Sequence, residues 1–155
     1  MIWDAHLQRL HGLEPGSFEG TYNAAMSRIV PEDRARVEKL ARRALEKGKD
    51  FSAEFRTRLP DGSIRYLFSR GRAIQDEGHP VGMSGVMLDI TEAKRAAREL
   101  EIEKTYLERL FEHAPEAIVL MDGQERVTRI NAEFTRLFGY TREEVAGRTV
   151  SHPTV

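Results

Sequence analysis

Two stretches of the sequence repeat one pattern of leucine and glycine, and their spacing limits how the chain can fold. One stretch runs from residue 10 to residue 20 and the other from residue 137 to residue 147, so they lie 127 residues apart (137 − 10). In each stretch a glycine follows the leucine after two positions, and a second glycine follows eight positions later. Each glycine is expected to close a short helix, because the left-handed backbone that ends a helix favours glycine.

A unit that repeats every 127 residues does not fit twice into a chain of 155 residues. We therefore expect two incomplete copies, the first without its opening strands and the second without its closing part. Residues 1–91 then form the first unit, residues 92–113 a connector helix, and residues 114–155 the beginning of the second unit. Residues 151–155 look like a chain end in the middle of a fold.

The first copy is expected to contain a long helix that begins at Pro31 and ends at Gly48. Proline suits the first helical turn, where an N–H would have no partner. Glu32 and Asp33 follow at the positive end of the helix dipole. Apolar residues then recur at helical spacing, at Val37, Leu40, Ala41, Ala44 and Leu45.

Three segments with the character of strands follow this helix. Residues 51–59 and residues 64–69 alternate between apolar and polar side chains, which is the period of a strand with one buried face. Residues 81–90 are rich in small and apolar side chains. Residues 60–63 and residues 76–80 carry the turn-forming sequences Pro-Asp-Gly-Ser and Asp-Glu-Gly-His-Pro. The pattern predicts an antiparallel meander.

The period becomes helical again from Glu92 to Phe111, with Thr91 as the expected N-cap. Five of six positions in a heptad seam are apolar, the seam being Ala93, Ala96, Leu100, Glu103, Leu107 and Leu110. Three heptads are the lower limit for a coiled coil. The pattern therefore leaves two alternatives, a coiled coil between two chains and a helix that packs on its own domain.

The second copy begins after a break at residues 113–115. We expect strands at residues 117–121 and 127–130, with a turn at residues 122–125 between them. Asn131 is expected to cap a helix over residues 132–138 that ends at Gly139, and Thr141 to cap another that stops at Gly147.

Composition excludes several classes of function. The chain has no cysteine, which rules out disulfides, cysteine nucleophiles and cysteine-ligated metals. A net charge of −1 gives no broad electrostatic footprint for nucleic acid or for an anionic membrane surface. The longest apolar run, residues 117–121, is far shorter than a membrane span, and the N-terminus has no signal-peptide character. We expect a cytoplasmic protein.

The sequence shows no catalytic constellation. The five histidines form no metal-binding pair at i, i+4 and no triad, and all are expected in surface or loop positions: His6, His11, His79, His113 and His152. A small hydrolase is the weakest alternative, because no nucleophile–base pair is evident. We therefore expect a non-enzymatic role.

Several segments resemble the PAS domain family. Residues 131–134 and 138–147 resemble the helical segment after the first two PAS strands, and residues 29–33 resemble the start of the long PAS helix. Residues 54–56 and 61–63, Gly82, Gly85 and residues 89–92 resemble the C-terminal PAS motif, of which Asp-Ile-Thr directly before a helix is the most specific piece. The resemblance covers nearly the whole chain, in two incomplete units.

The resemblance implies an α+β fold, with a five-stranded antiparallel sheet and helices on one face. It also implies sensing or dimerisation upstream of a histidine kinase, a diguanylate cyclase or a similar output domain, so that only the parent protein would be an enzyme. A haem-binding PAS domain would carry a histidine on the long helix, and a photoactive flavin PAS domain needs a cysteine. The sequence has neither, which disfavours both cofactors, while a non-covalent flavin or a small metabolite stays open.

The predicted meander carries two sets of candidate binding residues. Met83 and Met87 share one face of the third strand, and the candidate pocket lining is Phe55, Tyr66, Phe68, Met83 and Met87; ordinary core packing is the alternative. Arginines also gather there, at Arg56, Arg58, Arg65, Arg70 and Arg72. They indicate either an anionic ligand or acidic partner, or a solvated sheet face.

Asp89 and Thr91 are the candidate residues for signal transmission. The resemblance implies that Asp89 ties the last strand to the outgoing helix, so a change in the sheet would alter that helix. The alternative is capping alone, worth about 1 kcal/mol.

The expected partner is a second copy of the chain, joined through the connector helix or by strand exchange. The third strand has an open edge, which the strands at residues 117–121 and 127–130 can complete. The helix between them, about 30 Å long, makes exchange between chains easier than completion within one chain, and an unpaired third-strand edge would contradict the idea. The alternative function is a ligand-free structural dimerisation module.

Overall fold

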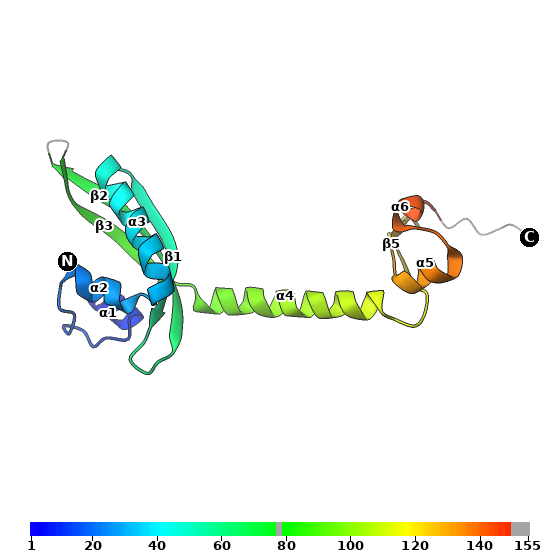
Figure 1. Cartoon of the computed structure of the whole chain (residues 1–155), viewed down its shortest axis with the longest axis horizontal. Coiled ribbons are helices and arrows are strands. Elements are labelled where there is room, and N and C mark those ends of the chain that lie inside the picture. Colours follow the sequence, from blue (N-terminus) through cyan, green and yellow to red (C-terminus); the bar gives the residue numbers. More distant parts are fainter. Residues whose placement is uncertain (77–78, 150–155) are drawn as a thin grey trace, which may run out of the picture. The chain divides into compact units, whose positions relative to one another are not determined.

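The computed structural model describes residues 1–76 and 79–149 and divides into two compact units, Met1–Ala96 and Ala97–Val155. Figure 1 shows the order of the elements along the chain. Both units combine helices with antiparallel strands. The α+β class predicted from the sequence is therefore confirmed.

The first unit is a three-stranded antiparallel sheet covered on one face by a long helix (Figure 1). Its strands lie in the order β1-β2-β3, which confirms the predicted meander. The elements are α1 (Ala5–Leu10), α2 (Tyr22–Arg28), α3 (Pro31–Lys47), β1 (Asp50–Arg58), β2 (Ile64–Asp76) and β3 (His79–Asp89). Residues 77 and 78 of the predicted second turn lie outside the described residues.

The helix α3 has the bounds that its sequence predicts. It begins at Pro31, and Gly48 ends it with a φ of 61°. In its first turn, Asp33 accepts hydrogen bonds from the backbone N–H of Arg56 (2.9 Å) and from the guanidinium Nε (3.0 Å) and Nη2 (3.1 Å) of the same residue. These bonds lower the pKa of Asp33 and fix the start of α3 to β1.

The core of the first unit lies between α3 and the covered face of the sheet. Side chains of β1 alternate strictly between buried and accessible positions, as the period of two predicts. The register places Phe55 of β1 opposite Leu67 of β2, which is completely buried. The core cluster is Leu10, Ile29, Val37, Ala44, Phe51, Ala53, Phe55 and Leu67.

The glycine repeat is confirmed at three of its four positions. Gly12 follows α1, and Gly139 follows α5 (Ala132–Phe138), with φ angles of 69° and 77°. Gly147 lies just beyond α6 (Arg142–Val145). The expectation is wrong at Gly20, where φ is also positive but no helix precedes it. A turn with proline and glycine at positions 15 and 16 stands there in place of the helix.

The helix α2 was not predicted from the sequence. Its N-cap is Thr21, whose side chain accepts a hydrogen bond from the N–H of Ala24 at 3.0 Å. The helix has seven residues and no fully buried side chain, so it lacks the long apolar stripe on which helix prediction depends.

The helix α4 (Thr91–Glu112) begins in the first unit and ends in the second. In the second unit, β4 (Val119–Met121) and β5 (Val127–Ile130) form a two-stranded antiparallel sheet, followed by α5 and α6. Arg129 of β5 forms an ion pair with Glu108 of α4 at 3.1 Å, and its guanidinium lies 4.4 Å from the centre of the Phe111 ring. Residues 150–155, including the predicted chain end, lie outside the described residues.

The prediction that β4 and β5 complete the first sheet within the same chain is wrong. Among the described residues, β3 pairs along one side only, with β2, while β4 and β5 pair with each other in a separate sheet. By the criterion given above, the edge of β3 that is unpaired within the described part of the chain also contradicts completion by exchange between two chains.

Candidate functional site

The junction between β3 and α4 brings the two predicted transmission residues together. Asp89 is the last residue of β3, and Thr91 is the first residue of α4. One carboxylate oxygen of Asp89, Oδ1, accepts a hydrogen bond from the backbone N–H of Thr91 at 2.9 Å. The strand end and the helix start are therefore joined by a side chain as well as by the backbone.

The hydroxyl of Thr91 contacts the sheet, and the expectation that it caps α4 is wrong. Thr91 Oγ1 accepts a hydrogen bond from the backbone N–H of Tyr66 in β2 at 3.0 Å. The N–H of Ile90 donates to the carbonyl of Tyr66, also at 3.0 Å. Asp89 supplies an acceptor for the first N–H of the helix, which leaves the Thr91 hydroxyl available to the strand.

Arg65 also belongs to this junction. Its Nε atom lies 3.1 Å from Oδ2 of Asp89. Its Nη1 atom donates to the carbonyl oxygens of Arg9 (3.0 Å) and Leu10 (2.7 Å) at the end of α1. One guanidinium thus bonds both the end of α1 and the end of β3.

Sequence reasoning grouped Arg65 with the other meander arginines and missed this role. The register separates it from them: Arg65 lies opposite the buried Thr57, whereas Arg70 lies opposite Ser52 on the other face. The local sequence carries no signal for this role, because hydrophobic residues stand on both faces of β2. Only the pairing with β1 shows that Arg65 shares the covered face with the buried Leu67.

The other meander arginines are exposed or paired with carboxylates of the same chain. Arg56 pairs with Asp33 at 3.0 Å, and Arg72 pairs with Asp50 at 3.1 Å. Arg70 lies 3.7 Å from the same aspartate, and Arg58 is exposed. These pairs favour a solvated sheet face over an anion-binding surface.

A further ion pair connects the first turn of α4 to β1. The ammonium group of Lys94 lies 2.6 Å from Oε2 of Glu54. Glu54 lies opposite Phe68, on the face of the sheet that α3 does not cover. The start of α4 is therefore held to both β1 and β2.

His11 lies next to this junction, in the turn after α1. The expected loop position is therefore confirmed, but the side chain is buried and not at the surface. Only 1% of its surface is exposed, and its ring stacks on that of Trp3 with 4.5 Å between centroids. Its Nδ1 atom lies 3.0 Å from the hydroxyl of Thr57, which donates to the carbonyl of Arg28. The hydroxyl proton is thereby engaged, so Nδ1 carries the proton of the imidazole.

The other ring nitrogen of His11, Nε2, is buried and has no hydrogen-bond partner. Burial, and then the positive charges of Arg28 and Arg65, lower the pKa of His11 from 6.5 to about 4. The imidazole is therefore neutral at pH 7. His6, His79 and His113 are exposed, as expected, and His152 lies outside the described residues.

The five candidate pocket residues do not share one site. Phe55 and Met87 face the covered side of the sheet, where Phe55 is in the core and Met87 packs against it. Met83 faces the same side but is 38% exposed. Tyr66 and Phe68 face the opposite side, since Leu67 between them points into the core. Neighbouring residues of a strand point to opposite faces, so these five cannot surround one ligand.

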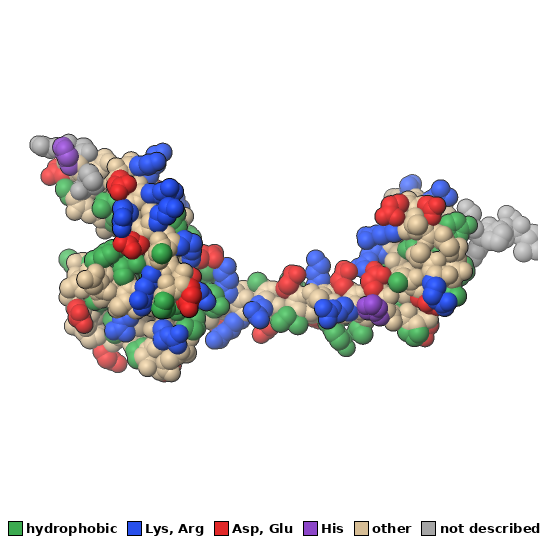
Figure 2. All heavy atoms as spheres, viewed as in Figure 1, with side chains coloured by type: hydrophobic (Ala, Val, Ile, Leu, Met, Phe, Trp, Pro, Cys, Tyr) green, Lys and Arg blue, Asp and Glu red, His purple; other side chains and the backbone are tan. Residues whose placement is uncertain are grey.

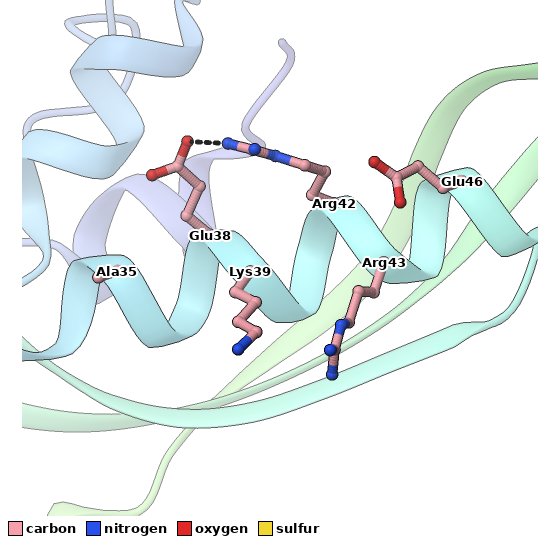
Figure 3. Close-up of a pocket in the computed structure, with 6 residues that line it drawn as sticks. All are labelled: Ala35, Glu38, Lys39, Arg42, Arg43 and Glu46. Carbon is pink, nitrogen blue, oxygen red and sulfur yellow. Dashed lines mark hydrogen bonds and ion pairs between the residues drawn. The ribbon is translucent and has the colours of Figure 1, made fainter.

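A shallow depression on α3 is formed by charged side chains of a single helix (Figure 3). Glu38 and Arg42 bond each other across it at 2.8 Å, while Lys39 and Arg43 point to another side of the helix. Figure 2 shows basic and acidic side chains intermixed on this part of the surface. Side chains from one helix enclose no cavity, so this depression is not a small-molecule site.

The described residues contain no group of three or more histidines and carboxylates able to hold a metal ion. No helix in the same part of the chain is long and apolar enough to cross a membrane. The candidate site is the junction held together by the bonds described above, and it consists of Arg65, Tyr66, Asp89, Thr91 and Lys94.

Comparison with known proteins gives relatives among signalling proteins. The chain is 31% identical over 132 residues to the sensor protein FixL of Bradyrhizobium diazoefficiens, covering 84% of this chain and 26% of that protein. It is 29% identical over 155 residues to the probable diguanylate cyclase DgcE of Escherichia coli, covering 98% of this chain and 14% of that protein. The chain thus spans about a quarter or less of the length of these relatives.

Solved structures show a similar fold. A sensory box histidine kinase/response regulator from Burkholderia thailandensis superposes with a TM-score of 0.57 and 30% identity, covering 69% of this chain and 80% of that one. An RNA-binding light-oxygen-voltage receptor superposes with a TM-score of 0.52 at 15% identity, covering 95% of this chain and 72% of that one, and supports the fold alone.

Two family models, both described as PAS fold, match the chain at residues 1–87 and at residues 105–154. The two matches correspond to the two copies inferred from the glycine repeat. The first match covers more than half of the chain, and the chain belongs to the PAS family.

Proposed function

We propose that this chain relays a signal from its first PAS unit to α4, through the junction at Asp89 and Thr91. The PAS unit is a sensory module and not a catalytic one. The observation that carries the proposal is that two neighbouring residues of β2 hold the junction. Arg65 pairs with Asp89, and Tyr66 donates to Thr91.

The free energies of the junction contacts are of the size that allosteric coupling between two sites requires. A side chain that bonds the start of a helix is worth about 1 kcal/mol, and a partly exposed ion pair such as Arg65–Asp89 adds about 0–1 kcal/mol. Allosteric coupling energies are typically about 1–3 kcal/mol. Loss of the helix-start bond would therefore change the balance between two arrangements of α4 by about fivefold, and loss of both contacts by about five- to thirtyfold.

The relatives support a kinase or cyclase output in the whole protein. They include a blue-light-activated histidine kinase of Brucella anthropi and the diguanylate cyclase DgcE already described. We propose that α4 passes the signal along the chain towards such an output domain, and that the division at residues 91–92 and 113–114 separates sensor, connector and second PAS unit.

We also propose that the chain is a homodimer through α4. Apolar side chains of the heptad seam are exposed on the surface of this helix: Leu100 is 67% exposed, Leu107 56% and Leu110 52%. Figure 2 shows hydrophobic side chains on the surface of α4. Residues at this spacing pair with the same residues of a second helix in a coiled coil.

A ligand-free dimerisation module is the second candidate function. It is supported by the core beneath α3, where Phe55 and Leu67 are buried and the candidate pocket residues divide between two faces of the sheet. Native mass spectrometry of the purified chain discriminates between the two. A retained small molecule supports sensing, whereas a dimer without ligand, also after addition of cell metabolites, supports the structural module.

The relay itself is tested in the full-length protein with Asp89→Asn. Asparagine keeps an acceptor for the Thr91 N–H but loses the charge that holds Arg65. We expect the response of the output activity to the input signal to weaken by up to about fivefold, while the melting temperature of the first unit changes by only a few degrees. The control is Asp76→Asn, which removes an exposed aspartate at the far end of β2. A normal response in Asp89→Asn contradicts the proposal.

A further inference from the structure

The two sets of bonds made by Arg65 connect α1 to α4. A guanidinium is planar and presents its N–H donors at fixed angles. When Nη1 binds the carbonyls of Arg9 and Leu10, the orientation of Nε towards Asp89 is therefore fixed as well. A movement of the end of α1 changes the geometry of the ion pair at the start of α4.

The end of α1 is a favourable binding partner for a cation. The last carbonyl groups of a helix have no partner within the helix and carry a partial negative charge. Arg65 therefore lies between two negative groups, the end of α1 and the carboxylate of Asp89. Its side chain is 28% exposed, so solvent screens these attractions only in part.

The segment that contains α1 holds together through its own contacts. The ring of Trp3 stacks on that of His11 (4.5 Å between centroids) and on that of Phe18 (3.8 Å). The amide of Gln8 donates to the carbonyl of Trp3 and accepts the N–H groups of Gly16 (2.8 Å) and Phe18 (3.3 Å). Residues 3–18, which we call the N-terminal segment, would therefore move as one body.

One feature makes this segment easier to displace from the sheet. His11 is its main polar anchor on β1, through Thr57, yet the other ring nitrogen of His11 is buried without a partner. A buried polar atom without a hydrogen bond destabilises the folded state. Displacement of the segment would hydrate this nitrogen and remove that destabilisation, which reduces the energy needed for the movement.

We propose that the N-terminal segment is the input element of the first PAS unit, and that Arg65 passes its position to Asp89 and the start of α4. The inference rests on the proposed relay at Asp89 and Thr91 and adds to it the direction from which the signal comes. Arg65 is a positioning residue in this mechanism. It acts through Asp89 and binds no ligand.

The test is hydrogen–deuterium exchange of the whole chain, with the amides of residues 91–95 as the readout. Trp3→Ala loosens the segment by removing the ring on which His11 and Phe18 both stack. We expect the amides of residues 91–95 to exchange about fivefold faster in this variant, which corresponds to a loss of about 1 kcal/mol. Residues 37–44 of α3 report global unfolding and should be unchanged.

The Arg65→Lys background makes the test specific for Arg65. Lysine keeps the charge but cannot hold two carbonyls and a carboxylate in one plane. In this background we expect Trp3→Ala to cause no further change at residues 91–95. A matched control is Tyr22→Ala, which removes an exposed aromatic ring of α2 and should leave the same amides unchanged. If Trp3→Ala reduces protection of α3, Gln8→Ala replaces it as the loosening variant.

Two results overturn the inference, and a further variant separates it from the proposed function. The inference is wrong if Trp3→Ala leaves residues 91–95 unchanged, or if its effect is the same in the Arg65→Lys background. Asp89→Asn is measured in parallel. If it accelerates exchange at residues 91–95 while Trp3→Ala does not, only the input role of the N-terminal segment fails. If neither variant changes these amides, the relay at Asp89 fails as well.

Discussion

His11 is held neutral by its surroundings, and this makes the stability of the first unit depend on pH. Its pKa is about 4 in the folded chain and about 6.5 when exposed. Between these values the unfolded chain binds a proton that the folded chain does not. The stabilisation is complete above pH 6.5 and decreases as the pH falls towards 4.

We expect the free energy of unfolding to decrease by about 2 kcal/mol between pH 7 and pH 5 because of His11 alone. In His11→Leu this part of the pH dependence should disappear, whereas His6→Gln, at an exposed histidine of α1, should retain it. Urea denaturation at the two pH values, followed by the fluorescence of Trp3, measures the difference. Equal pH dependence in wild type and His11→Leu would show that the imidazole is not held neutral.

At this scale the sequence predicted the positions of Asp89 and Thr91, because the Asp-Ile-Thr pattern directly precedes a helix. It did not predict Arg65 or the burial of His11. The partners of these residues lie 55 and 46 positions away, at Leu10 and Thr57. Such contacts depend on strand register and on how α1 packs on the sheet, and local periodicity contains neither.

The pairing of β2 with β3 depends on two glycines that lie opposite each other. Gly71 of β2 is the register partner of Gly85 of β3. A Cβ atom at Gly85 would collide with the carbonyl oxygen of Arg70 and lie 2.8 Å from Cα of Gly71. At Gly82, three residues earlier on the same strand, a Cβ atom would meet nothing within 4 Å.

We expect Gly85→Ala to lower the free energy of unfolding by about 2–3 kcal/mol, since backbone atoms of β2 and β3 must separate to admit the methyl group. Gly82→Ala is the matched control and should change it by about 0.5 kcal/mol or less. Chemical denaturation of both variants measures this difference. Similar effects at the two positions would mean that β2 and β3 do not approach as closely as the register indicates.

The elements themselves could largely be predicted from the sequence. The bounds of α3, β5 and α5 agree with their patterns, because each combines a clear periodicity with a capping residue or turn. The faces of β2 were harder to assign. Tyr66 and Phe68 are hydrophobic as well as Leu67. Only the pairing of β2 with β1 shows that Leu67 is the one that faces the core.

At the scale of the whole molecule, α4 begins in the first unit and ends in the second. Lys94 and Thr91 hold its start to the first sheet, and Arg129 of β5 holds its end through Glu108 and Glu112. The helix is thus anchored at both ends. The seam of apolar residues between the anchors has no partner among the described residues, and a second copy of α4 would cover it.

We expect the purified chain to be a dimer and Leu100→Glu/Leu107→Glu to be a monomer, because two carboxylates at seam positions would have to be buried without partners. Ile102→Glu is the matched control: Ile102 is 59% exposed on the same helix but lies outside the seam, so this variant should remain a dimer. Light scattering coupled to size-exclusion chromatography gives the mass of each. A monomeric wild-type chain would contradict dimerisation. A double variant that stays dimeric would exclude the seam of α4 as the dimer contact.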